Sequence, residues 1–486
     1  MPIAAPRHRD AWPLCGQGRK CKGIGGLPPV WFSVANWRRY PRFACKQAGG
    51  VGLLSEVTSP PRVVGTLGAV LLSANSVIGA GIFALPAVLY AATGNFSPWM
   101  FLIFGLFHTF TVLVAARLAT MFEASGGAQL YTQAAFGPLA GFLVGWLAVL
   151  GWAAGRGAAL AVLVAYLAVF FPVLADPLAH QLAILVLLAG LCGLSLAGMR
   201  NAMNGLITGT VLKLGPVLVL CVVAFASGGI ATSFTPPSFG KFESVALLVY
   251  YALSGTISVN TSAGEVKDTR RTLPRSMLLT LAGTTLFYMA VQWAYIAAGA
   301  PASSGNATPL AAAAGVLMGQ AGVVAITFAA VFSIATNSLA SFVLAPRVLF
   351  GMAERGLLPP ILAHVSRRFL APDAAILLFT LIAATISFSG AFAFLATVTV
   401  LAARVTNLAM VASFVRMQLR MPKQHGGGMS PLWSLIAAIA FGFGAYICAQ
   451  APPLAFGLLA GLLLVGGLLF KLARSERVIT PEPLLD

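Results

Sequence analysis

The sequence has 486 residues, of which 59% are hydrophobic and only 9% are charged. Soluble domains carry roughly 25% charged residues, so this composition excludes an ordinary soluble protein. The net charge of +18 does not indicate nucleic acid binding, because ten of the 30 Lys and Arg residues lie in residues 1–62 and most others lie in short loops. That distribution is the positive-inside pattern of proteins embedded in a lipid bilayer.

Apolar segments near the ~20 residues that span a bilayer recur from about residue 63 to residue 471. They are continuously apolar rather than alternating, which excludes a β-barrel. The predicted fold class is therefore an all-α polytopic membrane protein. Twelve transmembrane helices are predicted, at residues 63–92, 98–122, 138–171, 180–199, 203–229, 243–265, 275–299, 318–352, 374–390, 392–415, 431–450 and 453–471.

The loop charges predict the orientation of these helices. The opposite side of the membrane carries only Lys241 in its loops, while the remaining basic loops and both tails fall on one side. Both termini are therefore predicted to be cytoplasmic, and the protein is expected in the cell (inner) membrane. Residues 1–62 are interpreted as a disordered basic cytoplasmic tail and residues 472–486 as a second tail. The first segment lacks the apolar core of a secretory signal; a targeting segment or a misassigned start codon is the alternative.

Two of the predicted helices are interrupted. The first contains VIGAGIFALP, residues 77–86, with two glycines and a proline, and the sixth contains ALSG, residues 252–255, followed by the polar run TISVNTS. They lie five helices apart, and an odd number of helices in a repeat makes its second copy enter the membrane from the opposite side. Interrupted helices at matching positions of two halves indicate the binding site of a transporter.

A helix break at membrane depth is tolerated only where the freed backbone groups line a cavity or are buried in protein. Freed N–H groups at the start of a half-helix suit a carboxylate, and freed carbonyls suit an ammonium group. An α-amino acid carries both charges a few ångströms apart, so two crossing breaks match its zwitterion. The alternative is that Gly79 and Gly81 only permit close helix packing.

Four segments in chain order resemble the amino acid–polyamine–organocation (APC) superfamily of permeases. They are IGAGIFALP at 78–86, SGGAQLYTQAAFGPLAGFLVGW at 125–146, YYALSGTISVNTSAGEVKDTRRTLPR at 250–275 and ASFVLAPRVLFGMAERGLLP at 340–359. The resemblance implies a LeuT-type fold with a first five-helix repeat at 63–229, a second, inverted repeat at 243–415 and two further helices at 431–471. The sequence departs from the family pattern at Asp268-Thr269, at Arg117 and at Ile257, which replaces a Glu of several members with cationic substrates.

The breaks and the resemblance together predict the substrate-binding residues, with Tyr251 as the aromatic that closes over the substrate. The predicted set is Ile78, Gly79, Ala80, Gly81, Ile82, Phe83, Tyr251, Ala252, Ser254 and Gly255.

Lys213 lies about ten residues from either end of the predicted fifth helix. A lysine there costs several kcal/mol unless it faces a cavity or a partner. It resembles the helix-5 lysine of proton-coupled relatives, which projects towards the backbone of the broken first helix in place of a sodium ion. We therefore predict that Lys213 couples proton binding to transport; a lysine that reaches the membrane interface is the alternative.

Three further residues inside predicted helices are given an interpretation. Arg156 is interpreted as a structural or gating residue, or as a cavity residue that affects specificity, and Asn337 as a cavity residue or an inter-helix hydrogen-bonding group. Arg404 is interpreted as structural. No Asp or Glu falls in the middle of a predicted span, so a cationic substrate would meet Lys213 without a compensating charge. Neutral amino acids are therefore the predicted substrates, with anionic ones the alternative.

The five histidines are scattered without metal-ligand spacing, and no phosphate-binding loop is present. The sequence thus predicts no enzyme, no cofactor and no metal site. It predicts a secondary amino acid transporter, with proton-coupled symport preferred and exchange or export as the alternative. Its expected partners are an amino acid, protons and the lipid bilayer; the oligomeric state is left open.

Overall fold

The computed structural model describes residues 62–122, 124–168, 171–228, 235–253, 255–299, 308–387, 392–420, 429–450 and 453–473. The chain divides into two units, Met1–Glu56 and Val57–Asp486. All described residues belong to the second unit. The predicted tails at 1–62 and 472–486 lie outside the described residues, except for Arg62, Leu472 and Ala473.

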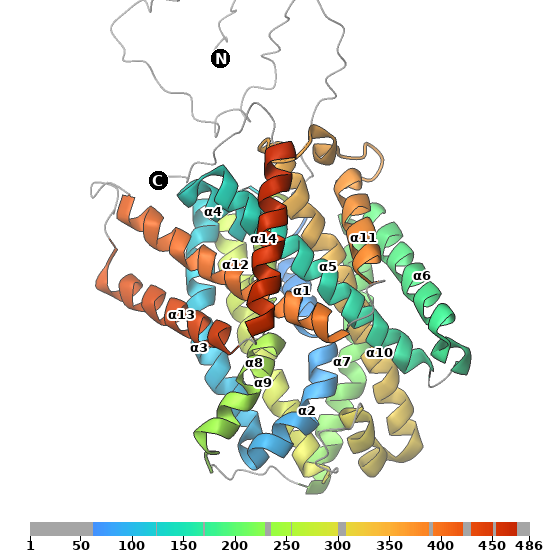
Figure 1. Cartoon of the computed structure of the whole chain (residues 1–486). Coiled ribbons are helices and arrows are strands. Elements are labelled where there is room, and N and C mark those ends of the chain that lie inside the picture. The colour runs from blue at the N-terminus through green and yellow to red at the C-terminus, as the bar shows by residue number, and fades with distance from the viewer. Residues whose placement is uncertain are drawn as a thin grey trace, which may run out of the picture. The chain divides into compact units, whose positions relative to one another are not determined.

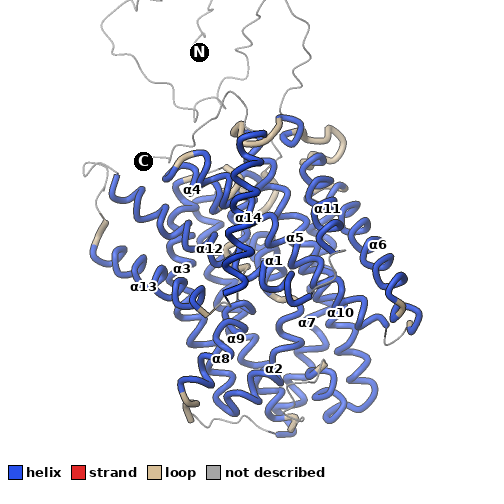
Figure 2. The backbone as a smooth tube through the Cα atoms, in the orientation of Figure 1, coloured by secondary structure: helices blue, strands red, loops and turns tan. Residues whose placement is uncertain are grey.

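The described residues form helices and no strand (Figure 2); Val64 and Val266 make one isolated parallel bridge. Four short 3-10 helices join the α-helices: η2 (Gly94–Phe96), η3 (Pro172–Ala175), η4 (Ser258–Glu265) and η5 (Pro360–Ala363). The α-helices are α1 (Thr66–Val77), α2 (Ala80–Thr93), α3 (Ser97–Met121), α4 (Ala128–Phe136), α5 (Pro138–Ala168), α6 (Pro177–Leu196), α7 (Met199–Gly228), α8 (Phe239–Leu253), α9 (Thr269–Ala297), α10 (Pro309–Glu354), α11 (Asp373–Ser387), α12 (Phe392–Arg420), α13 (Pro431–Ala449) and α14 (Pro453–Ala473).

Several of these helices can cross a membrane. Among the described residues, eight helical segments are long and apolar enough to do so by length and composition, and α1 and α11 are shorter apolar helices. Large apolar side chains such as Val186, Val222 and Leu432 stay exposed on outer helix faces, as bilayer contact requires. The chain is therefore an all-helical, multi-pass membrane protein; the count of twelve spans stays a prediction.

Both predicted interruptions are present in the backbone. The first falls between α1 and α2, where Ile78 and Gly79 leave the helical conformation. The second falls between α8 and η4, where Gly255 has φ +106°. The structure contains two features that the sequence analysis did not predict. They are the short helix α4 and a third interruption within α10, where Gly319 has φ +62°. The span predicted to begin at residue 318 thus follows a separate helical segment.

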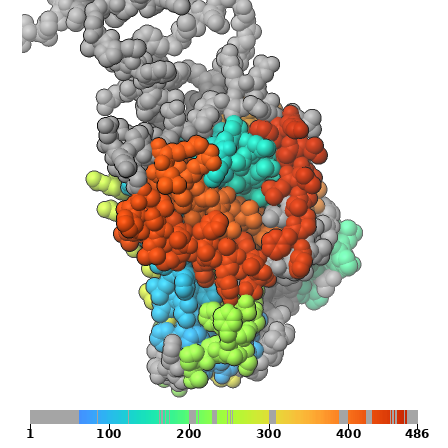
Figure 3. Space-filling view, turned by 60° about the vertical axis from the view of Figure 1, so that its left-hand side comes forward, coloured from blue at the N-terminus to red at the C-terminus, as the bar shows by residue number. Residues whose placement is uncertain are grey.

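The helices pack around α1 and α5, which run through the interior (Figure 1). On the face shown in Figure 3, the orange and red atoms of α12, α13 and α14 flank the teal atoms of the α4 region, and the blue and green atoms of α3 and α8 lie below them. Two apolar clusters form the core. One includes residues of α3, α5, α10 and α11, and the other includes residues of α2, α8 and α9 together with the first half of α10.

Buried ionic groups fix the segments at the α4 end. Arg347 of α10 pairs with Glu265 of η4 at 2.7 Å, and both side chains are buried. Arg355 donates to the Ser125 carbonyl at 3.1 Å and to the side chains of Gln129 and Gln133 on α4. Burial lowers the pKa of Arg355 to about 10, so its guanidinium remains a cation at neutral pH and holds α4 against the end of α10.

Candidate functional site

A cavity of about 150 Å³ lies beside the two helix breaks. Pockets for drug-sized ligands measure roughly 300–1,000 Å³, so this cavity suits a smaller molecule. Its described walls come from both interrupted helices and from α3, α4, α5, α10 and α12. The lining residues are Ser76, Val77, Gly79, Gly81, His108, Gly126, Ala128, Gln129, Ala148, Gly151, Trp152, Arg156, Ala252, Gly255, Ile257, Ser258, Asn260, Thr261, Asn337, Ser341, Leu344, Val348, Thr399, Ala403, Thr406, Asn407 and Met410.

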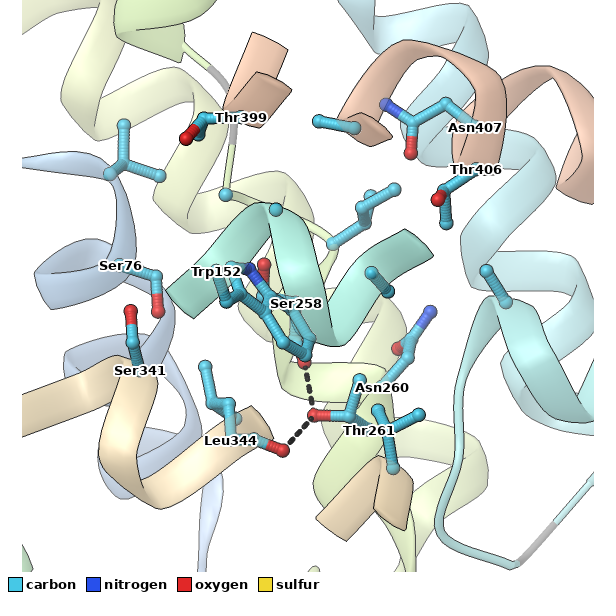
Figure 4. A pocket seen from close by; sticks show the side chains of 18 of the residues that line it. Ser76, Trp152, Ser258, Asn260, Thr261, Ser341, Leu344, Thr399, Thr406 and Asn407 are labelled. Atoms are coloured by element: carbon cyan, nitrogen blue, oxygen red, sulfur yellow. Dashed lines mark hydrogen bonds between the residues drawn. The ribbon is translucent and has the colours of Figure 1, made fainter. Parts of the chain in front are cut away.

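Polar side chains enter this cavity from several sides (Figure 4). Ser76 and Ser341 lie near one another, and Thr406 and Asn407 approach from α12. Thr261 is held in place by hydrogen bonds to the carbonyls of Ser258 at 2.8 Å and Leu344 at 3.2 Å. Trp152 supplies a large aromatic surface from α5. The cavity therefore combines hydrogen-bonding groups with apolar surface.

The carbonyls that end α1 are satisfied by side chains of other helices. Lys213 Nζ donates to the Ile78 carbonyl at 2.8 Å, and Ser333 Oγ donates to the same oxygen at 3.2 Å. Tyr288 Oη donates to the Val77 carbonyl at 3.1 Å. Asn337 Nδ2 donates to the carbonyls of residues 75 and 76, each at 2.9 Å. The C-terminal end of α1, which would lack partners inside a helix, is thus capped by α7, α9 and α10.

Arg156 completes this arrangement from α5. Its Nη1 donates to Asn337 Oδ1, so that Asn337 bridges Arg156 and the end of α1. Gly79 lies directly against the same amide, since a Cβ there would come within 2.7 Å of Asn337 Cγ. The glycine is needed for this close approach. Arg156 therefore acts on the break through Asn337 while its side chain lines the cavity.

The two interruptions touch each other. Ser73 Oγ of α1 donates to the Thr256 carbonyl at 2.6 Å. Gly255 packs against the Ser76 carbonyl so closely that a Cβ would approach the oxygen to 2.6 Å. Gly81 and Ala252 are also in contact range, since a Cβ on Gly81 would lie 3.8 Å from Ala252. The two breaks therefore pack directly against each other.

The start of α2 has no such protein cap among the described residues. Its N-cap, Gly79, has no side chain, and no acidic residue lies in its first turn. The first N–H groups of a helix lack intrahelical partners and carry the positive end of the helix dipole. Because Gly79 and Gly81 line the cavity, this end of α2 offers a carboxylate-binding position.

The charge around the cavity is positive. Its described lining residues include Arg156 but no Asp or Glu. Lys213 and Arg404 are also buried nearby, at 1% and 2% exposure, and Ala403, next to Arg404, lines the cavity. Among the described residues no cluster of His, Cys, Asp and Glu could hold a metal ion.

The structure brings together part of the predicted set. Gly79, Gly81, Arg156, Ala252, Gly255 and Asn337 all line the cavity, and Lys213 reaches the first break. The side chains of Ile78, Ile82 and Phe83 instead pack in the second apolar cluster, so these residues face the site only through their backbone. Ser254 and the side chains of Ala80 and Tyr251 lie outside the described residues.

Several lining residues were not singled out from the sequence. They include Trp152 of α5, His108 of α3 and the α12 residues Thr399, Thr406 and Asn407. The three α12 residues could have been found from the sequence by their spacing. Positions 399, 403, 406, 407 and 410 recur at the spacing of one helix face, and three of them are polar within an apolar helix.

The hydrogen bonds that cap α1 predict that removal of two hydroxyl groups will lower the stability of the protein to different extents. Tyr288→Phe should lower the stability of the folded protein by about 1–3 kcal/mol, because the described residues give the Val77 carbonyl no other side-chain donor. Ser333→Ala should cost less, because Lys213 still donates to the Ile78 carbonyl. Thermal unfolding of the two purified variants measures the loss of stability in each. Equal losses would contradict the prediction that the Val77 carbonyl depends on its single side-chain donor.

An all-helical, multi-pass membrane protein with a polar cavity between two interrupted helices is, by class, a membrane transporter rather than an enzyme. The chain belongs to the amino acid permease family: the family described as "Amino acid permease" matches residues 64–457. This confirms the predicted membership of the APC superfamily.

Relatives with similar sequences carry transporter names. An uncharacterized transporter of Mycobacterium bovis, Mb2022c, is 30% identical over 68% of this chain and 76% of its own length. The uncharacterized transporter Rv1999c of Mycobacterium tuberculosis matches to the same extent. The serine/threonine exchanger SteT of Bacillus subtilis is 26% identical over 64% of this chain and 73% of its own length.

Proposed function

We propose that this protein is a secondary transporter that carries neutral amino acids with protons by alternating access. The observation that carries the proposal is the 2.8 Å hydrogen bond from Lys213 Nζ to the carbonyl of Ile78 at the first helix break. Lys213 forms no ion pair among the described residues. An intramembrane lysine without a counter-charge lowers the stability of the protein, so its presence indicates a function. Gain or loss of its proton changes the charge beside the backbone that binds the substrate.

The substrate carboxylate is proposed to bind the amides at the start of α2, in residues Ala80 to Phe83. The carbonyls of α1 already accept hydrogen bonds from protein side chains. The ammonium group is therefore assigned to the second break, at the end of α8, with Ala252, Ser254 and Gly255. Tyr251 is proposed to close over the bound substrate. A cationic side chain is disfavoured, because Arg156 lines the same cavity and the described lining has no carboxylate.

The proposed fold is a LeuT-type pair of inverted repeats, at residues 63–229 and 243–415, with residues 431–471 outside them. Helix packing supports it. In such a pair α3 corresponds to α9, α5 to α10 and α6 to α11, and each of these helices packs against its counterpart. This is expected when a two-fold axis in the membrane plane passes between them. Twelve spans, two cytoplasmic termini and the inner membrane are part of this proposal.

The conformation is proposed to face the cytoplasm. The cavity continues from the breaks to Gly126 and Gln129 at the α4 end, which the basic loops assign to the cytoplasmic side. Beyond the breaks, Ile82, Phe83 and Tyr250 belong to an apolar cluster that fills the opposite half. Transport then requires that cluster to open while the α4 end closes.

The test is uptake of radiolabelled neutral amino acids into proteoliposomes, with and without an imposed proton gradient. Symport predicts accumulation only when the exterior is acidic, with loss of accumulation when a protonophore is added. Lysine and arginine should neither accumulate nor compete. Accumulation that ignores the gradient would contradict proton coupling, while the absence of any amino acid uptake would contradict the transport proposal itself.

Exchange is the second candidate, and the name of the relative SteT, a serine/threonine exchanger, favours it. The same proteoliposomes separate the two mechanisms. Exchange predicts that uptake needs unlabelled amino acid inside the vesicle and does not need a proton gradient. Serine and threonine are the first pair to load, and export is tested by loading the vesicles and measuring efflux.

A further inference from the structure

We propose that the turn at residues 366–371, in the loop between α10 and α11, is a docking surface for phospholipids with an anionic headgroup. Its two arginines bind the headgroup phosphates, and its two exposed apolar side chains enter the boundary between headgroups and acyl chains. The proposal goes beyond transport and requires only that the chain spans a bilayer.

The turn lies where membrane-spanning segments end. The candidate span in α10 ends at Glu354, and the apolar helix α11 begins at Asp373. The turn also touches the end of α6, since a Cβ on Gly198 would lie 2.6 Å from the carbonyl oxygen of Phe369. Helices α6 and α11 lie side by side at the outer edge of the helices (Figure 1). The turn is therefore close to the level at which the bilayer meets water.

Backbone hydrogen bonds and buried side chains fix the turn. The Leu370 N–H donates to the Ser366 carbonyl at 2.8 Å, and the Ser366 N–H donates to the Ala371 carbonyl at 2.9 Å. Leu362, Val365 and Ala371 are buried in the apolar cluster that includes residues of α10 and α11. The same few side chains are therefore always presented at the tip of the turn.

The tip of the turn exposes two cations and two large apolar side chains. They are Arg367, Arg368, Phe369 and Leu370, of which Phe369 is 41% and Leu370 44% exposed. The guanidinium carbon of Arg368 lies 5.0 Å from the centre of the Phe369 ring. Residues 359–372 contain no Asp or Glu. A surface that is both basic and apolar matches the interface of an anionic membrane, where apolar groups insert and cations bind phosphates.

The backbone of Leu370 gives an independent reason to expect a partner. Its φ is +52°, a left-handed conformation that is unfavourable for a residue with a Cβ. In water, the exposed leucine side chain would add a second unfavourable contribution. In a membrane interface, the same side chain leaves water, which is favourable. A bilayer therefore accounts for both the strained backbone and the exposed side chain.

The turn continues a surface that faces lipid. Leu377 and Leu381 lie one helical turn apart on α11 and are 55% and 65% exposed. Leu194, near the end of α6, is also exposed. Because such side chains contact acyl chains, the phosphates of the same leaflet lie beyond the helix ends, near Arg367 and Arg368. The docking surface is thus the polar edge of the lipid-facing surface of α6 and α11.

The charge of the chain's own N-terminal segment disfavours it as the occupant of this surface. Residues 1–62 contain ten Lys and Arg but only two Asp and Glu. Like charges brought together across an interface repel each other. The anion that binds Arg367 and Arg368 is therefore expected from outside the chain.

The experiment measures the thermal stability of the purified protein in a neutral detergent. Phosphatidylglycerol, phosphatidylcholine and sodium phosphate are added in separate titrations. Phosphatidylglycerol should raise the apparent Tm by about 2 °C or more relative to phosphatidylcholine. Sodium phosphate should not, because it carries no acyl chain. The proposal is overturned if the two lipids act alike or if phosphate alone reproduces the effect.

The double variant Arg367→Gln with Arg368→Gln tests the basic half of the surface. Each basic residue near an anionic surface contributes about fivefold, so the phosphatidylglycerol concentration for half-maximal stabilisation should rise about 30-fold. The matched control is Arg270→Gln with Arg271→Gln, another adjacent pair of exposed arginines. Arg271 already pairs with Asp268 at 3.9 Å, so this control should shift much less. Equal shifts would overturn the proposal, because they would show a general attraction of basic residues.

Leu370→Asn tests the apolar half of the surface. Asparagine adopts the left-handed conformation more readily than leucine, so this variant should be at least as stable as the unmodified protein in detergent alone. It should nevertheless need about fivefold more phosphatidylglycerol, because the leucine side chain no longer enters the membrane. An unchanged requirement would overturn the role of Leu370. These titrations contain no amino acid, so their outcome is independent of whether the protein transports one.

Discussion

Lys213→Met should greatly reduce the response of amino acid uptake to a proton gradient. The methionine fills a similar volume but cannot donate to the Ile78 carbonyl or carry a proton. Coupling between two sites typically changes the affinity of one of them by about 5- to 150-fold when the other is occupied. The ratio of uptake with the gradient to uptake without it should fall by a similar factor. Uptake into proteoliposomes at equal protein content measures this ratio.

Two further measurements distinguish lost coupling from lost folding. Counterflow of labelled substrate without a gradient should persist in Lys213→Met, because Ser333 still donates to the Ile78 carbonyl. The control is Lys241→Met, which changes an exposed lysine at the start of α8 and should leave the gradient response intact. Gradient-driven accumulation by Lys213→Met at the level of this control would overturn the coupling assignment.

The positions of the breaks could be predicted from the sequence, because glycine is the residue that leaves a helix without steric cost. Gly79 and Gly255 stand within apolar segments that otherwise form regular helices, and both mark actual interruptions. The contact between Lys213 and the first break was expected from the resemblance to proton-coupled relatives, and physical chemistry agrees with it. A lysine in mid-membrane must find a polar partner, and the free carbonyls of a broken helix are such partners.

The partners of the α1 carbonyls could not be predicted in the same way. Tyr288 and Ser333 lie more than 200 residues from the carbonyls that they cap, and nothing local in α9 or α10 distinguishes them from other hydroxyl residues. Helix α4 was missed because its segment was used only for its resemblance to the family, and a helix of 9 residues is too short to be found by a search for membrane spans. Its position depends on Arg355, which reaches it from the end of α10.

Arg404 shows a different limit. The sequence places it inside a helix, and it was interpreted as structural. Buried arginines often bind carbonyls or carboxylates. In the structure its nitrogen atoms have no such partner among the described residues. Whether a buried charge is paired depends on residues brought together from several helices, which no single segment reveals.

Gly255→Ala should be the most damaging of the small substitutions at the breaks. The new Cβ would lie 2.6 Å from the Ser76 carbonyl oxygen and 3.0 Å from its carbon. Backbone atoms cannot rotate away as a side chain can, so the two breaks must separate. The cost combines overpacking of about 1–3 kcal/mol with that of a non-glycine residue at positive φ, about 1–3 kcal/mol. Displacement of reacting groups by about 1 Å can cost about 100-fold in rate, and we expect a comparable loss of uptake.

The matched control for Gly255→Ala is Gly299→Ala, which separates the contact from the backbone strain. Gly299 also has positive φ, at +60°, but a Cβ there would meet nothing within 4 Å. It should therefore lose only the strain component in thermal unfolding and should retain uptake. Equal uptake by both alanine variants would show that the two breaks need not touch during transport. A selective loss in Gly255→Ala, with both proteins folded, would indicate that the contact between Gly255 and the Ser76 carbonyl transmits movement from one interrupted helix to the other.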